Sequence, residues 1–570
     1  MKKKKKIQKK EYSLTDKQLL FVKSLFIGSF FLVGIFHEFT ACIFVVIELI
    51  LIYYLYQKNK GLIIYDDINF VLMIFIIFMY LFSVIYAIDR GMAFIGFVTM
   101  LTVILFLIIA MQLSTNQRND LCKVIPLSEI IMIMIGLISL ITGIGYRWLF
   151  VNNRMGGFFQ YPNTFALFLL LGIIVIYNKK TLEKKEYLFF TVLLFGILST
   201  GSRTVYLITF GFLIYFSYKN RNILKISLCL LGCLVMLLLV ATFTNVEISV
   251  IERISDINLS SSTFLGRLLY YKDGIFTAIK HPLGLGYLGY YFIEPQIQTG
   301  IYSIRFIHND LLQIILDVGI LPGFLFIWII IKSFLSKNIN SLNRQMIIAI
   351  ILHSMLDFSL QYKSIFFILI LCLDFYSGKK KILYKDNFKN LKLFGTCISS
   401  FIVFYIGVSM SFHYFGLTDL SIKYLPFYTE AMVSKISTTK DLDEGILLAK
   451  KILKINSYVP VAYDVLAVNE YINENYDAMI RYKEKSIDLQ KYNIKALDNY
   501  ITMLSTAIEY YQDVDEDKCN EYAQKILNIP FKIDEIKNNT SYLAYQIADK
   551  PDFNLSIQSK KIIEMINESR

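Results

Sequence analysis

Long apolar runs alternate with short polar segments along the first 414 residues of the chain. The sequence of residues 91–111, GMAFIGFVTMLTVILFLIIAM, is typical of these runs. A helix needs about 20 mainly apolar residues to cross the hydrocarbon core of a bilayer, so the pattern predicts an all-α, multi-pass transmembrane helix bundle of about 12–13 spans. The candidate spans lie near residues 19–36, 40–56, 68–88, 92–113, 124–143, 163–178, 186–200, 203–218, 223–244, 314–335, 345–361, 363–378 and 392–413.

The pattern changes at residue 415, where the apolar runs give way to a polar sequence that is typical of helices. Within this tail, Tyr458 and Ala462 recur as Tyr492 and Ala496, 34 residues later. This spacing is the period of the tetratricopeptide repeat, a helix–turn–helix unit that stacks into a solenoid. We therefore expect residues 415–570 to form a soluble, tetratricopeptide-like helical-repeat domain, with an irregular helical bundle as the alternative.

The net charge of +13 is explained by membrane topology rather than by nucleic-acid binding. The basic residues gather in short segments between the apolar runs, and such segments of membrane proteins accumulate Lys and Arg on the cytoplasmic side. With thirteen spans and a cytoplasmic N-terminus, every basic cluster falls in the cytoplasm. The clusters are Lys2–Lys10, Lys58 with Lys60, Lys179–Lys185, Lys219–Arg221, Lys332–Arg344 and Lys379–Lys392.

This orientation predicts three parts: a basic cytoplasmic N-terminus (1–18), a polytopic membrane domain (19–414) and an extracytoplasmic tail (415–570). The large loop 245–308 then lies on the outer face of a bacterial cytoplasmic membrane. With 55% hydrophobic and 18% charged residues, the chain is too apolar for a soluble enzyme. Its seven cysteines form no CxxC pair, which argues against a disulfide framework or a zinc site.

Several cations lie on the predicted outer face, where Lys and Arg are usually depleted. The guanidinium group has a fixed fork of donors that matches phosphate oxygens, so these arginines predict a site for a phosphorylated lipid. Arg203 directly precedes a span, and for this residue the alternative is an interfacial anchor whose side chain snorkels to the membrane surface. The outer cations are Arg154, Arg203, Arg267, Lys272, Lys280 and Arg305.

His308 ends the large outer loop and opens the next predicted membrane helix in the sequence HNDLLQ. An imidazole at the membrane–water boundary titrates near neutrality and can act as a general base. The alternative is that Asn309 or Asp310 caps the helix and that His308 is merely exposed.

His353 and Asp357 are spaced i, i+4 on another predicted membrane helix and should share one face of it. Ionisable residues inside a membrane are functional candidates. We expect the two residues to form either a structural hydrogen-bonded pair or a proton relay.

These motifs together resemble the O-antigen ligase superfamily, which contains O-antigen ligases, O-antigen polymerases and membrane O-oligosaccharyltransferases. The similarity covers roughly residues 150–375. Its stretches are RMGGFFQYPNTFA at 154–166, TGSR at 200–203, GRLLYYKDGI at 266–275, HPLGLGY at 281–287, HNDLLQIILDVGILPG at 308–323 and, more weakly, HSMLDF at 353–358.

The resemblance implies a membrane glycosyltransferase that needs neither a metal nor another cofactor. Its donor would be a glycan on undecaprenyl pyrophosphate, with Arg203 and Arg267 holding the pyrophosphate and His308 deprotonating the acceptor. Arg154 and Asn309 are further substrate-binding candidates. The family often has Gly where Thr204 stands, and Trp where Tyr271 stands.

The expected reaction is ligase-type transfer to a glycan, wall or protein acceptor that the tail recruits, beside membrane lipid and without nucleic acid. One alternative is a polymerase that joins lipid-linked repeat units of a surface polysaccharide. A second alternative is a transporter of lipid-linked glycans that performs no chemistry. A transporter should show paired internal repeats of its membrane half, and no such repeat is visible in the sequence.

Overall fold

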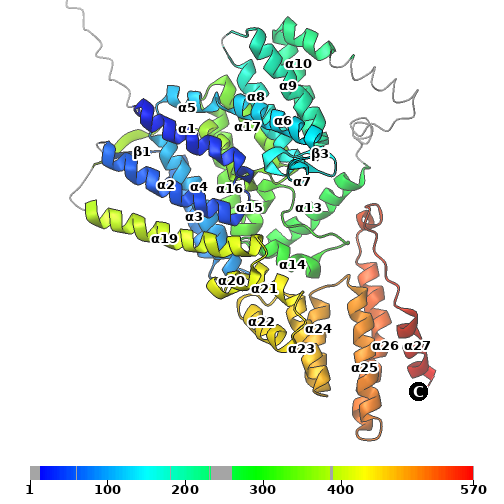
Figure 1. The fold of residues 1–570 in the computed structure, drawn as a ribbon. Helices are drawn as coiled ribbons and strands as arrows, with labels where there is room; N and C mark the ends of the chain where they lie inside the picture. The colour runs from blue at the N-terminus through cyan, green and yellow to red at the C-terminus, as the bar shows by residue number, and fades with distance from the viewer. Residues whose placement is uncertain are drawn as a thin grey trace, which may run out of the picture.

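The computed structural model describes residues 13–59, 61–179, 181–229, 232, 260–384 and 389–568. Up to Tyr414, helices make up most of the described chain and pack into a bundle (Figure 1). The bundle helices are α1 (Asp16–Phe31), α2 (Glu38–Lys58), α3 (Ile68–Ser83), α4 (Arg90–Met111), α5 (Thr115–Cys122), α6 (Ile125–Thr142), α7 (Tyr146–Leu149), α8 (Pro162–Tyr177), α9 (Lys184–Thr200), α10 (Arg203–Lys219), α13 (Ser262–Lys280), α14 (Gly289–Ile297), α15 (Asp310–Val318), α16 (Ile320–Leu335), α17 (Ser341–Ser354), α18 (Lys363–Cys372) and α19 (Lys389–Tyr414).

Four helical segments of the described chain are long and apolar enough to cross a membrane: Glu38–Lys58, Arg90–Met111, Thr115–Thr142 and Asn390–Tyr414. Shorter apolar helices accompany them, so the predicted all-α membrane bundle is confirmed. The total of 12–13 spans stays a prediction, and most of the span predicted near 223–244 lies outside the described residues.

Two of the short helices form the centre of the bundle. In α8 every residue from Thr164 to Ile176 is buried, and every residue of α18 is buried. A helix that is apolar on all sides must be surrounded by protein or lipid. Phe367 of α18 stacks on Phe106 of α4 with ring centroids 4.0 Å apart, which shows that protein side chains surround α18.

The single span predicted near 314–335 is wrong, because the chain breaks at Gly319 between α15 and α16. Gly319 has φ +101°, and a Cβ atom there would lie 2.6 Å from the carbonyl oxygen of Pro282. The glycine-containing segment after Pro282 inserts at this break. Leu285 N donates to Leu316 O (2.7 Å) and Ile320 N donates to Pro282 O (2.9 Å), so backbone groups freed by the break are paired again.

Short β pairs and 3₁₀ turns join the helices. β1 (Gly61–Asp66) pairs antiparallel with β4 (Lys379–Tyr384), with Gly61 opposite Tyr384. β2 (Phe150–Val151) and β3 (Arg154–Met155) form a two-residue ladder that carries Arg154. The 3₁₀ turns are η1 (Val33–Ile35), η2 (Gly157–Phe159), η3 (Ser359–Gln361) and η4 (Tyr542–Tyr545).

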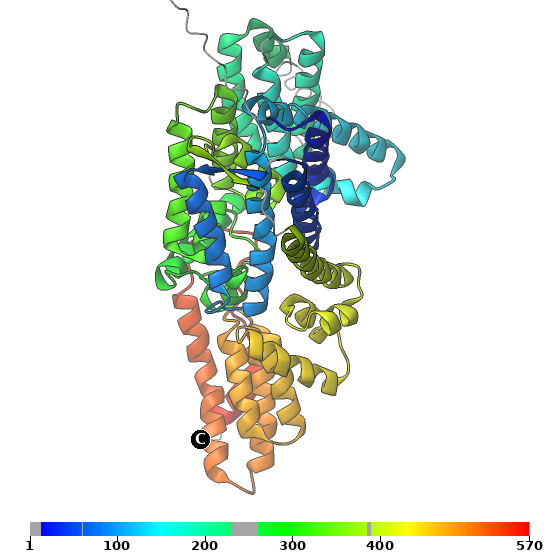
Figure 2. The same ribbon diagram turned by 90° about the vertical axis from the view of Figure 1, so that its left-hand side faces the viewer.

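The tail is helical as predicted and extends from one end of the bundle (Figure 2). Ala462 and Ala496, the recurring alanines, are both buried in the first turn of a helix. The tetratricopeptide assignment itself stays a prediction. The tail helices are α20 (Thr418–Tyr424), α21 (Thr429–Ile436), α22 (Leu442–Ile455), α23 (Pro460–Ile472), α24 (Tyr476–Asp488), α25 (Ile494–Tyr511), α26 (Glu516–Asn538) and α27 (Ile557–Glu568).

Hydrogen bonds fasten the tail to the bundle at several separate points. Asn456 donates from its side chain to Asp89 (3.0 Å), which caps α4. The backbone nitrogen of Lys491 donates to Pro295 O (3.1 Å), and that of Ser541 donates to Thr299 O (2.8 Å). The tail is therefore docked on the bundle and is not joined to it by α19 alone.

The predicted topology can be tested with single cysteines at exposed loop positions. Asp513→Cys, in the loop between α25 and α26, should react with a membrane-impermeant maleimide in intact cells when Cys519 is replaced by Ser. Lys337→Cys, in the loop between α16 and α17, should react only after lysis when Cys519 and the exposed Cys229 and Cys397 are also replaced by Ser. The reverse pattern would contradict the predicted orientation, which rests on the basic clusters.

Candidate active site

The side chain of Asp357 lies at the centre of a polar cluster. The residue follows the end of α17 and precedes η3, and its carboxylate is fully buried, at 0% exposure. Tyr161 donates from its hydroxyl to both carboxylate oxygens (3.0 and 3.2 Å), and Asn163 donates from its amide (2.7 Å). The backbone nitrogen of Phe358 is a further donor (2.9 Å).

Two basic side chains complete the surroundings of this carboxylate. Arg267 lies 3.5 Å from Oδ2, and Nδ1 of His308 lies 3.3 Å from Oδ1. Taking a carboxylate out of water is costly unless donors and cations surround it. The three hydrogen-bond donors and Arg267 provide this compensation at Asp357. Nδ1 of His308 lies within ion-pair distance of the same carboxylate.

The backbone holds His308 in place from two sides. Its φ is +55°, a conformation that non-glycine residues rarely adopt and that is concentrated at functional sites. Tyr271 of α13 donates to the carbonyl oxygen of His308 (2.6 Å). Asn309 caps α15 by accepting from Leu312 N (3.0 Å), as expected, and its amide donates to Met355 O (3.1 Å).

Arg154 connects this cluster to the TGSR segment. Its Nε donates to the carbonyl oxygen of Thr200 (2.7 Å), and one terminal nitrogen donates to Asn163 (2.8 Å). Asn163 in turn donates to Asp357. Arg154 thus holds the turn between α9 and α10 against the carboxylate cluster. Two of its guanidinium nitrogens donate hydrogen bonds within the protein.

Arg203 begins α10 immediately after that turn, as the sequence predicts. The turn requires a left-handed residue, and Gly201 supplies it with φ +62°. Arg203 is half-buried, and its neighbour Thr204 lines an apolar groove. The structure brings Arg267 and His308 into direct contact with Asp357 and links Arg154 to it through Asn163. Arg203 lies three residues after Thr200, whose carbonyl oxygen accepts from Arg154.

The predicted shared helix face of His353 and Asp357 is wrong. α17 ends at Ser354, so Asp357 is not on the helix that carries His353. Nδ1 of His353 instead hydrogen-bonds the hydroxyl of Ser359 (2.9 Å), which contacts Thr164 (3.0 Å).

Three site residues have no role that the sequence predicts, although all lie in the motifs given above: Tyr161, Asn163 and Tyr271. For Tyr161 and Asn163, the sequence feature that could have indicated a role is the YPN segment. Its proline is the first residue of α8, and the side chains on both sides of it hydrogen-bond Asp357.

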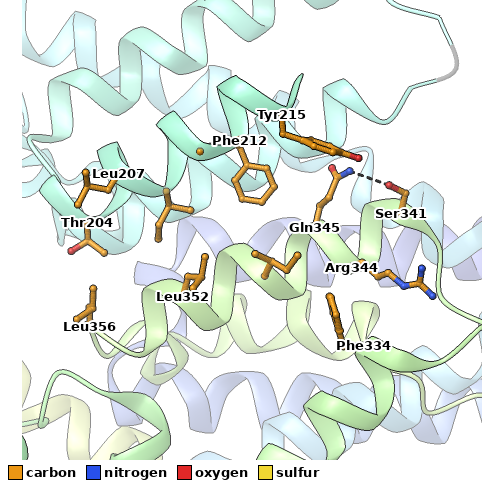
Figure 3. Close-up of a pocket in the computed structure, with 13 residues that line it drawn as sticks. Thr204, Leu207, Phe212, Tyr215, Phe334, Ser341, Arg344, Gln345, Leu352 and Leu356 are labelled. Atoms are coloured by element: carbon orange, nitrogen blue, oxygen red, sulfur yellow. Dashed lines mark hydrogen bonds between the residues drawn. The ribbon is translucent and has the colours of Figure 1, made fainter. Parts of the chain in front are cut away.

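An apolar groove of about 750 Å³ begins beside this cluster and runs between α10 and α17 (Figure 3). Thr204 and Leu356, the neighbours of Arg203 and Asp357, lie at one end. Ser341 and Arg344 lie at the other end (Figure 3). From Ser341 to Ser354, α17 rises about 20 Å, which is roughly two thirds of the hydrocarbon thickness of a bilayer.

Comparison with known proteins places this region in a family. Residues 188–327, from α9 to α16, match the family model of O-antigen ligase. The match covers about a quarter of the chain, so this region is similar to O-antigen ligases. No curated protein and no solved structure matched the chain. The matched region includes Arg203, Arg267, His308 and Asn309, whereas Arg154, Asp357 and the tail lie beyond it.

The match supports a membrane enzyme of the O-antigen ligase and polymerase type, and the apolar helices support a multi-pass membrane protein. The resemblance recognised from the motifs is confirmed on this point.

The Asp357 cluster predicts a specific stability effect. Asp357→Asn removes the charge that Arg267 and His308 face in a buried site, so it should cost about 3–5 kcal/mol of unfolding free energy. The matched control is Asp66→Asn, which removes an exposed ion pair with Lys381 and should change stability little. Thermal unfolding of the purified variants, followed by tyrosine fluorescence, measures both. Equal unfolding midpoints for the two variants would contradict the central role of Asp357.

Proposed function

We propose that this protein is a glycosyltransferase of the ligase type, which transfers a glycan from undecaprenyl pyrophosphate to an acceptor hydroxyl without a metal ion. The observation that carries the proposal is the contact between His308 and the buried Asp357, beside Arg267 and next to the end of an apolar groove. A base, a cationic group and a lipid-sized apolar space are the parts that this reaction needs.

The groove suits the polyprenyl part of the donor. Its middle is lined by apolar side chains, among them Leu207, Phe212 and Leu352 (Figure 3). A chain lying there packs on these side chains through van der Waals contacts, since the surrounding lipid is as apolar as the groove. Its pyrophosphate would then lie at the end marked by Thr204 and Leu356.

At that end, Arg203 and Arg267 would hold the pyrophosphate. Arg267 is 12% exposed and contacts Asp357 through one terminal nitrogen, so other donors of its fork can bind phosphate oxygens. Arginine binds phosphate bidentately, and such charge-assisted hydrogen bonds are about twice as strong as neutral ones.

His308 would act as the general base. Its Nδ1 faces Asp357, so Nε2, on the other side of the ring, is the nitrogen that can accept a proton. A carboxylate on the first nitrogen orients the ring and stabilises the imidazolium that forms, as in Ser–His–Asp triads. The ring is 23% exposed, which leaves a path to an acceptor.

The proposed step balances without another reactant. Nε2 of His308 takes the proton of the acceptor hydroxyl while its oxygen forms a bond to the anomeric carbon of the donor glycan. The bond from that carbon to the pyrophosphate oxygen breaks, and its electron pair stays on undecaprenyl pyrophosphate. Arg203 and Arg267 stabilise the charge that develops there.

Polymerisation is the second candidate, because it uses the same chemistry with a second lipid-linked glycan as the acceptor. The species that accumulates in a deletion strain distinguishes the two. Long lipid-linked chains indicate a ligase, and single repeat units indicate a polymerase. A transporter gives no chemical reason for a histidine held by a buried carboxylate.

The arginine assignment predicts the effect of exchanging Arg for Lys. Arg203→Lys and Arg267→Lys keep the positive charge but lose the bidentate fork. Each should lower the transfer rate from purified lipid-linked glycan on the order of tenfold or more, at unchanged protein level. Full transfer by both variants would mean that these arginines are structural anchors.

The base assignment predicts a larger loss for His308→Ala, on the order of 10²-fold or more in the transfer rate, with donor binding kept. The matched control is His281→Ala, because His281 ends α13 and has no contact with Asp357 among the described residues. In-vitro transfer by both variants, folded to similar extents, provides the measurement. Turnover by His308→Ala near that of the unchanged protein would remove the base assignment.

A further inference from the structure

A second cavity, of about 380 Å³, lies where the tail meets the bundle. Its walls come from the start of α2, the end of α19, the loop before His308, and the tail around α21. Figure 1 shows α19 lying along α2 and leading into α20 and α21. The size is within the range of about 300–1,000 Å³ that is typical of small-molecule sites.

One wall of this cavity is aromatic. His37 lies 4.7 Å from Tyr414 and 5.6 Å from Phe39 by ring centroid, and Phe39 lies 5.0 Å from Tyr414. Within the described part of the chain, Nε2 of His37 is buried and has no hydrogen-bond partner. This wall therefore offers ring faces together with an unused polar atom.

The other wall is charged. Arg305 forms ion pairs with Glu38 of α2 and with Glu430 of α21. Tyr287 and Tyr428 donate to these carboxylates, at 3.0 and 3.4 Å. Two carboxylates face one guanidinium, so the group carries one net negative charge.

The two walls together indicate which chemical class of ligand the cavity can bind. An alkyl chain would cover the ion pairs without hydrogen-bonding them, which is costly. A phosphate would meet net negative charge. A pyranose ring satisfies both walls, since its C–H face packs on aromatic rings and its hydroxyls hydrogen-bond to carboxylates and to imidazole.

The cavity lies close to the proposed base. Phe36, which lines it, is 6.3 Å from Phe358 by ring centroid, and Phe358 is 4.9 Å from His308. Leu356, on the other side of Asp357, lines the apolar groove. Leu356 thus lines the groove, Asp357 is the buried carboxylate, and Phe358 packs against Phe36 of the cavity wall.

We propose that this cavity binds a sugar ring of the acceptor, and that the tail completes it through Tyr428 and Glu430. The acceptor assignment rests on the proposed transferase function, whereas saccharide binding does not. The sugar could come from a lipid-linked glycan or from the cell wall, and the chemistry of recognition is the same for both.

The test measures binding without turnover, on full-length His308→Ala protein in nanodiscs. Saturation-transfer difference NMR is recorded with two probes: the glycan that mild acid releases from the host's lipid-linked intermediates, and soluble wall disaccharides from a muramidase digest. We expect ring-proton signals from at least one probe. Binding of the first probe alone identifies a lipid-linked acceptor, and binding of the second identifies a wall acceptor.

Tyr414→Leu in the same protein should weaken this binding about tenfold, because it removes one ring face. The matched control is Phe401→Leu on the same helix, at a position that is 69% exposed and away from the cavity. Equal binding by both variants, or no binding of either probe at millimolar concentration, would overturn the proposal. Two results together would separate the proposals: weaker saccharide binding by Tyr414→Leu, and full transfer by the Arg203→Lys and Arg267→Lys variants. They would contradict the donor-site assignment and support the saccharide site in the cavity.

Discussion

A buried carboxylate anion is the constraint on which the site depends. Removing the charge of Asp357 from water is costly unless donors and cations surround it. Tyr161, Asn163, Arg267 and His308 supply them, and they come from segments that lie far apart in the sequence. The need to compensate one charge therefore brings the start of α8, the second turn of α13 and the residues before α15 to one point. It also orients the imidazole ring.

The same constraint explains why the chain departs from regular helices near the site. His308 has a positive φ, α15 and α16 are separated at Gly319, and α17 ends before Asp357. Irregular backbone at membrane depth is tolerated only where protein groups pair it. Here the segment after Pro282 and the side chain of Asn309 provide that pairing. His308 is thus one of several non-glycine residues of the described chain with a positive φ, and it lies where chemistry is proposed.

The all-α membrane fold class follows from the sequence, because apolar run length is a strong one-dimensional signal. The tail domain and the outer-face position of the arginines, which rest on composition and charge bias, stay predictions. The partners of Asp357 do not follow from the sequence. Helix periodicity predicts His353, four residues before Asp357, as the partner of Asp357. The end of α17 at Ser354 is set by tertiary contacts, and so are the contacts of Asp357 with Tyr161 and Arg267, 196 and 90 residues away. Contacts over such separations leave no local pattern.

Arg305, like Asp357, is a charged side chain whose partners come from segments far apart in the sequence. Its guanidinium lies between Glu38 of the bundle and Glu430 of the tail, so each of the two parts supplies a charge that the other compensates. Burial raises the pKa of Glu430, and the charge of Arg305 opposes that effect. Separating the tail would break the ion pair between Arg305 and Glu430, while Arg305 would keep Glu38 as its partner within the bundle. The abrupt change of composition at residue 415 indicates a separate domain, yet the electrostatics make the tail an integral wall of the membrane enzyme.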